Sequence, residues 1–128
     1  MGAGYSDWYL VEDSAALDFL NEAAVTGARS APHDAAARMA TSGSGKLMSL
    51  VAGEVDNVAE TETRFAKPRG MGYAELYAAL KPLTEQPGAA LWRRMMVLGP
   101  PPEFCLVSRA QVALPPEFQP ESISRSPI

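Results

Sequence analysis

Residues 58–66 alternate between two kinds of side chain, and this alternation constrains the fold more than any other feature of the sequence. Charged residues take one side of the segment and uncharged residues take the other side: Glu60, Glu62 and Arg64 against Thr61, Thr63 and Phe65. A period of two places successive side chains on opposite faces of a β-strand, whereas a helix repeats about every 3.6 residues. The sequence therefore predicts a strand here, with Glu60 and Glu62 as solvated charges on an exposed face.

Four further segments predict strands, because aromatic, β-branched or other apolar residues fill them and turn or polar residues bound them: residues 8–11, 46–52, 91–98 and 104–107. The pattern of 91–98 also fits a helix, but the Gly-Pro-Pro-Pro turn that follows favours a strand. We expect 46–52 to be a central strand, because it is apolar on both faces. It should pair with 58–66 as a hairpin around Gly53.

Two regions predict helices. In the first region, Asp13 or Ser14 can cap a helix that carries Leu17 and Leu20 on its apolar face. Gly27 interrupts this region before it continues to residue 40, so one kinked helix and two short helices both remain open. The second predicted helix covers residues 73–81, where four apolar or aromatic residues form one stripe: Tyr73, Leu76, Tyr77 and Leu80.

The order of these elements predicts an α+β fold. Read along the chain they give β-α-β-β-α-β with an extra C-terminal strand, which is the ferredoxin-like order, an antiparallel sheet with both helices on one face. We expect residues 1–118 to form a single α+β domain and residues 119–128, rich in Pro and Ser, to form a loose C-terminal tail. Because 46–52 is apolar on both sides, the other face of the sheet needs a cover. A second copy of the chain would provide it, giving a homodimer in which two sheets close into a dimeric α/β barrel.

The first strand Trp8-Tyr9-Leu10-Val11, the hairpin around Gly53 and the late strand over 91–98 give the chain a layout that resembles the dimeric α/β-barrel superfamily. This superfamily includes small monooxygenase-like, muconolactone-isomerase-like and stress-responsive barrel proteins. The resemblance is one of layout only, over roughly residues 8–110, and no diagnostic catalytic motif accompanies it. It implies that small molecules, often aromatic or polyketide-like, bind between helices and sheet, or that the protein has no activity.

Composition argues against several classes of function. The net charge is −4 and the Lys and Arg residues are scattered, so the basic patch typical of nucleic-acid binding is missing. Cys105 is the single cysteine, which excludes an intramolecular disulfide and a cysteine-based zinc set. We therefore expect no metal and no cofactor. No apolar run approaches the roughly 20 residues of a membrane span, and no signal peptide is apparent, so we expect a cytoplasmic protein without membrane contact.

Three residues are candidates for catalysis: His33, Arg93 and Arg94. His33 is the single histidine, and an imidazole can move a proton near neutral pH, although a surface or helix-capping role is the simpler alternative. Arg93 and Arg94 interrupt an apolar run, and a guanidinium inside a barrel could bind a carboxylate or enolate oxygen. In a strand they would face opposite ways. The alternative is that one is solvated while the other pairs with an acid such as Glu103.

Three aromatic residues are candidates for ligand contacts, with a role in the core as the alternative: Tyr9, Tyr73 and Trp92. The first functional hypothesis is a small-molecule-binding dimeric barrel, as a plain binder or as a cofactor-free isomerase, decarboxylase or oxygenase. The second is a non-catalytic dimeric structural or interaction protein. The third is a nucleotide or nucleic-acid binder that uses the basic, glycine-containing loop over residues 67–72. The sequence leaves open whether the protein is an enzyme.

Overall fold

A computed structural model describes residues 6, 8–11, 15, 45–56 and 58–126 of the chain. The chain divides into two compact units, residues 1–43 and residues 44–128, and nearly all described residues belong to the second. The helical region predicted between residues 13 and 40 lies outside the described residues, apart from Ala15. The strand predicted at 8–11 is wrong, since these residues have no strand structure and pair with none of the five described strands. Four apolar residues cannot form a strand without a neighbour that accepts their backbone hydrogen bonds.

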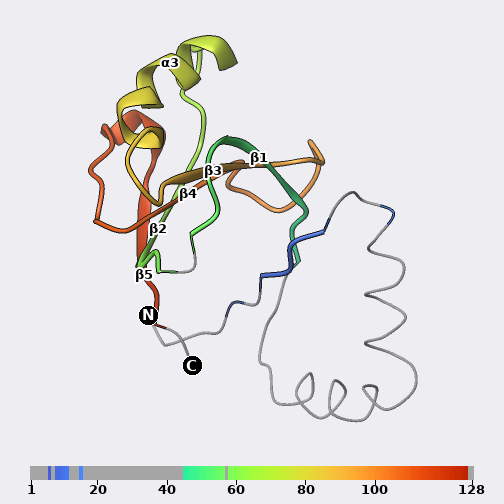
Figure 1. Cartoon of the computed structure of the whole chain (residues 1–128). Helices are drawn as coiled ribbons and strands as arrows, with labels where there is room; N and C mark the ends of the chain where they lie inside the picture. The colour runs from blue at the N-terminus through green and yellow to red at the C-terminus, as the bar shows by residue number, and fades with distance from the viewer. Residues whose placement is uncertain (1–5, 7, 12–14, 16–44, 57, 127–128) are drawn as a thin grey trace. The chain divides into compact units, whose positions relative to one another are not determined.

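The second unit contains a five-stranded antiparallel sheet (Figure 1). Its strands, in chain order, are β1 (Met48–Gly53), β2 (Thr61–Phe65), β3 (Ala90–Arg94), β4 (Phe104–Ser108) and β5 (Glu121–Ser124). They lie side by side in the order β1-β3-β4-β2-β5. The predicted antiparallel sheet of an α+β fold is therefore confirmed, and the alternating segment forms β2. The segment predicted at 91–98 is a strand only as far as Arg94, where a loop begins.

One helix, α3 (Tyr73–Thr84), connects β2 to β3. β4 lies between β2 and β3 and is antiparallel to both, so β2 and β3 run parallel. Parallel strands joined through a helix form a β-α-β unit. The helix predicted over 73–81 is confirmed and extends three residues further. Pro82 lies in the last turn of this helix, near its C-terminal end.

The hairpin predicted around Gly53 is wrong, because β1 pairs with β3 and not with β2. Gly53 has a φ of +86°, and a Cβ at this position would collide with the carbonyl oxygen of Ala89. Glu54 donates its N–H to that same oxygen, at 3.0 Å. This close approach holds the end of β1 against the start of β3, and the chain then crosses to the far side of β4 before β2 begins.

The core lies between α3 and one face of the sheet. Seven buried side chains form it: Phe65, Leu76, Leu80, Leu91, Phe104, Leu106 and Phe118. Phe65 and Phe104 stack with ring centroids 5.3 Å apart. Phe118 belongs to a short 3₁₀ helix, η2 (Pro116–Phe118), and packs edge-on against Phe65 at 5.9 Å. Aromatic pairs at such distances add to the free energy that their burial contributes.

The C-terminal segment 119–128 differs from the loose tail predicted for it, because residues 121–124 form β5 and pair with β2. Thr61 lies opposite Ser124, and Arg64 lies opposite Glu121. A strand next to β2 satisfies backbone groups that would otherwise stay unpaired at a sheet edge. The composition of the segment concealed this, since pairing through the backbone needs no apolar run.

Candidate functional site: the polar face of the sheet

The sheet has a second face, opposite α3, which we call the polar face. Residues that lie opposite each other in an antiparallel pair point to the same face. Arg64 pairs with Cys105, Cys105 pairs with Trp92, and Trp92 pairs with Leu50, so these four side chains share the polar face. Two further residues join them by register or alternation, namely Glu62 and Arg94.

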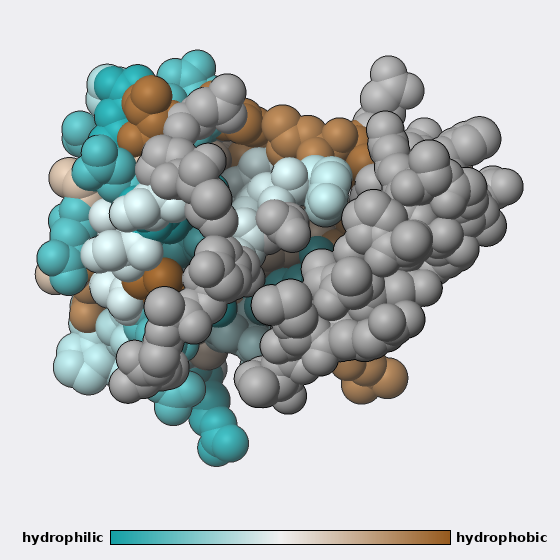
Figure 2. Space-filling view, turned by 90° about the horizontal axis from the view of Figure 1, so that it is seen from below, coloured by the Kyte–Doolittle hydropathy of each residue, from teal (hydrophilic) through white to brown (hydrophobic). Residues whose placement is uncertain are grey.

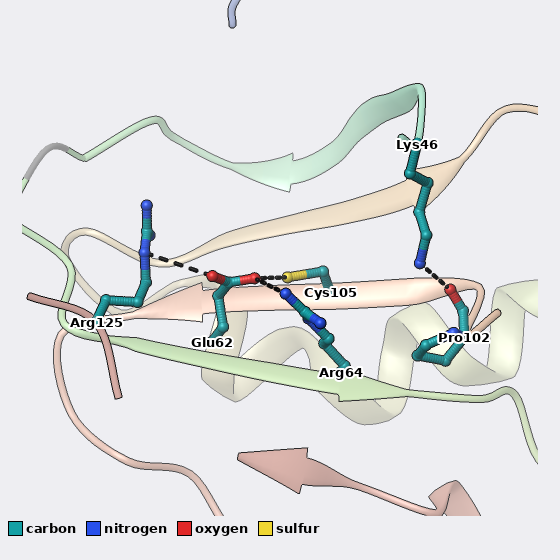
Figure 3. Close-up of polar contacts among 6 residues, drawn as sticks. All are labelled: Lys46, Glu62, Arg64, Pro102, Cys105 and Arg125. Carbon is teal, nitrogen blue, oxygen red and sulfur yellow. Dashed lines mark hydrogen bonds and ion pairs between the residues drawn. The ribbon is translucent and has the colours of Figure 1, made fainter. Parts of the chain in front are cut away.

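Glu62 is the central residue of the polar face, and its side chain is only 3% exposed (Figure 3). Arg64 donates from Nη2 to Oε1 of Glu62 at 3.4 Å, and Nε of Arg125 lies 3.6 Å from Oε2. The prediction that Glu62 is a solvated charge is therefore wrong, because β2 is an inner strand rather than an exposed one. A buried carboxylate costs several kcal/mol in lost hydration, which the two guanidinium groups offset. Glu60 is exposed, as predicted.

Cys105 is a buried free thiol beside this carboxylate. Its Sγ donates to Oε1 of Glu62 at 3.5 Å. Burial, followed by the negative charge of Glu62, raises the pKa of the thiol to about 12. The thiol therefore stays protonated at neutral pH and acts as a hydrogen-bond donor, not as a nucleophile.

Two more cations on the same face, Lys46 just before β1 and Arg94 at the end of β3, donate to the loop between β3 and β4. Lys46 donates from Nζ to the carbonyl oxygen of Pro102 at 2.7 Å, and Arg94 donates from Nη1 to the carbonyl oxygen of Gly99 at 2.8 Å. Burial, followed by the charge of Arg64, lowers the pKa of the Lys46 ammonium. Nε of Arg94 is buried and has no hydrogen-bond partner among the described residues. The polar face thus gathers several cations around one buried carboxylate.

Arg93 points to the opposite face of the sheet and belongs to a different cluster. Its Nε lies 2.9 Å from Oε2 of Glu103, and Tyr73 donates its hydroxyl to the same oxygen at 2.8 Å. Cζ of Arg93 lies 3.8 Å from the centre of the Tyr73 ring, a cation–π contact. This is the pairing with Glu103 that was the alternative to a ligand-binding role.

The structure thus separates the residues that the sequence singled out. Arg94 and Trp92 lie on the polar face, whereas Arg93 and Tyr73 lie together on the side of α3. Tyr9 is 65% exposed to solvent. His33 lies outside the described residues, so its candidate role in catalysis stays a prediction.

The basic loop after β2 borders an open hollow of about 800 Å³. Lys67 and Arg69 line it, but so do the acidic residues Glu75 and Glu117. Lys67 donates from Nζ to the carbonyl oxygen of Met71 at 2.6 Å, so its ammonium is already engaged within the loop. Mixed charge of this kind does not favour a phosphate-binding site.

Sequence reasoning missed four residues that build the polar face: Lys46, Glu62, Arg64 and Arg125. The alternation in β2 did place Glu62 and Arg64 on one face, and that was the available signal. The burial of Glu62 depends on β4 and β5, which lie far along the chain and pair with β2. Within the described part of the chain, no group of three or more His, Cys, Asp or Glu residues could hold a metal ion. Among the same residues, no helix has the length and apolar character to cross a membrane.

The chain matches no protein-family model, and no curated protein or solved structure matches it. The resemblance to the dimeric α/β-barrel superfamily therefore stays a prediction. The function of this protein is therefore inferred from its fold and from the polar face alone.

Proposed function

We propose that this protein binds a small molecule on the polar face of its sheet and that two copies enclose this face as a homodimer. The network around Glu62 carries the proposal. A sheet face that only needs a cover is usually apolar, whereas this face holds ionised groups in fixed positions at a cost in hydration. A few oriented polar groups beside apolar ones, here Trp92 and Leu50, are typical of small-molecule sites.

The strand order supports a ferredoxin-like fold whose first strand is β2. This strand lies later in the chain than the first strand that the sequence suggested. The path β2–α3–β3–β4–η2–β5 follows the order β-α-β-β-α-β, with η2 in the position of the second helix. In this alignment the extra strand is β1, at the edge beside β3, and not a C-terminal one. A second copy that packs on this side of the sheet would close a barrel around the ligand.

Exposed apolar residues support the homodimer. Figure 2 shows hydrophobic residues at the surface among hydrophilic ones. Four consecutive ones in the loop after β3 are 54% to 95% exposed: Met95, Met96, Val97 and Leu98. A contiguous apolar run at the surface is typical of a protein interface. We propose a second copy as its partner, since the loop adjoins the face that the barrel would enclose.

Light scattering over a range of concentrations tests the homodimer. We expect twice the mass of the 13.7 kDa chain at micromolar concentration, and we expect Val97→Asp to shift the mass toward that of one chain. Val58→Asp is the matched control, because Val58 is 63% exposed but lies outside this loop. A monomer at all concentrations would contradict the dimer and leave ligand binding to be tested separately.

Trp92 offers a direct reporter of ligand binding to the polar face. The chain has two tryptophans, so Trp8→Phe leaves a single indole N–H cross-peak in a ¹H–¹⁵N spectrum. We expect this peak to shift saturably with at least one of three aromatic probes that differ in charge: benzoate, benzamide and benzylamine. No shift with any of them at millimolar concentration would contradict small-molecule binding on this face.

The cofactor-free enzyme classes remain a narrower proposal. They need a proton-transferring group beside the ligand, and the polar face offers Glu62 but commits it to two arginines and a thiol. Binding without catalysis is therefore the function that the described residues support best. We also propose, from the composition, a cytoplasmic location.

A further inference from the structure

Among the described residues of the polar face, cations outnumber buried carboxylates. Four cations gather there, namely Lys46, Arg64, Arg94 and Arg125, around the single buried carboxylate of Glu62. Glu121, opposite Arg64 on β5, is exposed to solvent. Like charges repel more strongly where burial lowers the effective dielectric constant.

The cations of this cluster make two kinds of contact. Figure 3 shows the ion pairs with Glu62 and the hydrogen bond from Lys46 to the carbonyl oxygen of Pro102. Arg64 and Arg125 share the carboxylate of Glu62. Lys46 and Arg94 instead donate to carbonyl oxygens of the β3–β4 loop, those of Pro102 and Gly99. A carbonyl oxygen orients a cation through a hydrogen bond but carries no net charge to neutralise it.

Arg94 also keeps one donor unused. Its Nε is buried and has no partner among the described residues, while Nη1 is fixed to Gly99. A buried donor without an acceptor destabilises a protein, more so when the group is charged. Such a group is retained where an acceptor arrives from outside, and a fixed guanidinium fits the two oxygens of a carboxylate or phosphate.

We propose that Lys46 and Arg94 bind an oxyanion, the carboxylate or phosphate group of the ligand, while Glu62 holds Arg64 beside them. This inference rests on the proposed function, since it names the chemical class of the ligand on that same face. Trp92, which shares the face with Arg94, would contact the rest of the ligand. Glu62 is then a positioning residue, which acts on the ligand through Arg64.

Pairs of probes that differ in charge test the oxyanion, followed by the Trp92 cross-peak of the Trp8→Phe protein. We expect benzoate or phenyl phosphate to bind about tenfold or more tightly than benzamide, because the amide lacks the negative charge. Comparing benzoate with phenyl phosphate identifies which oxyanion the site prefers. Equal binding of benzoate and benzamide would overturn the oxyanion and keep small-molecule binding, whereas no binding of any probe would overturn both.

Arg94→Gln and Lys46→Gln locate the site. Each should weaken oxyanion binding about tenfold or more while leaving benzamide unaffected. Arg109→Gln is the matched control, since Arg109 is a surface residue paired with Asp56 at 2.7 Å, and it loses the same charge. Equal losses in all three variants would indicate a general charge effect and overturn the site.

The melting temperature without ligand provides a second readout. Arg94→Gln should lower it only slightly, because the lost hydrogen bond to Gly99 is offset by removal of a buried charged donor, Nε, that has no acceptor among the described residues. A marked drop in melting temperature together with unchanged oxyanion affinity would assign Arg94 to the fold and overturn its role in binding.

Discussion

The two faces of the sheet are made from alternate residues of the same strands, yet their contents differ completely. On the α3 side, β2 and β4 contribute Phe65 and Phe104, which stack within a closed apolar core. On the polar face, the same strands contribute Glu62, three residues before Phe65, and Cys105, directly after Phe104. Apolar burial is non-directional and tolerates some rearrangement, whereas a buried carboxylate depends on particular partners. The apolar face therefore stabilises the fold. The polar face costs part of that stability, because it holds charged groups in fixed positions.

Phe104→Ala should have the largest effect on stability, because it opens a cavity in the apolar face. Phe104 is fully buried between Phe65 and α3, so we expect a loss of about 3–5 kcal/mol in the free energy of unfolding, measured by urea denaturation. A loss below about 1 kcal/mol would mean that this face is not the source of stability.

Glu62→Gln should destabilise the protein by about 2 kcal/mol, because it leaves Arg64 and Arg125 without a counter-charge. We expect less than for a fully buried pair, since both arginines are only half-buried. Glu60→Gln is the matched control in the same segment. Glu60 is exposed, so its substitution should change the free energy of unfolding by no more than about 0.5 kcal/mol. Equal effects of the two variants would refute the network on the polar face.

High pH should weaken the polar face through Cys105. The folded-state pKa of this thiol is about 12 against 9.0 for a free thiol, so the unfolded chain loses its proton first as the pH rises. The stabilising contribution is complete below pH 9 and declines above it, by at most about 1.4 kcal/mol per pH unit. Urea denaturation of wild type and Cys105→Ala between pH 8 and pH 10 isolates this contribution. A wild-type protein that declines no faster than the variant would contradict a buried thiol.

Tyr73→Phe should have the smallest effect, about 0.5–1 kcal/mol, since it removes one hydrogen bond to Glu103 at the rim of the apolar face. The stacked Arg93 stays over the ring in either case. Thermal unfolding of the two proteins measures the difference. A loss as large as that of Glu62→Gln would mean that the Arg93–Glu103 cluster matters to the fold as much as the polar face does.

The sequence predicted local structure well where a pattern repeats within one element. The alternation at 61–65 and the stripe from Tyr73 to Leu80 both identify their elements, because each period follows from backbone geometry alone. Pairing was predicted less well. The hairpin around Gly53 seemed the shortest connection, but the backbone approach between Gly53 and Ala89 directs β1 to β3 instead.

The candidate site was predicted only in part, because burial on a sheet depends on strand order. Arg94 was singled out because it interrupts an apolar run and Trp92 as a candidate aromatic ligand contact, and both lie on the polar face. Glu62 looked like an ordinary surface charge, since nothing local reveals that β4 and β5 flank its strand. Arg125 lies within the segment that was expected to be a loose tail, so its ion pair with Glu62 had no sequence signal.

The position of β2 has a consequence for the order in which the protein acquires its structure during synthesis. Both neighbours of β2 are made after it, β4 first and β5 last of all the strands. Until residues 121–125 are available, one side of β2 presents free backbone groups and Glu62 lacks one of its two arginines. A nascent chain halted before that point exposes a strand edge to other chains, which is a route to aggregation. Pairing of β5 with β2 therefore removes the exposed strand edge that would otherwise favour aggregation.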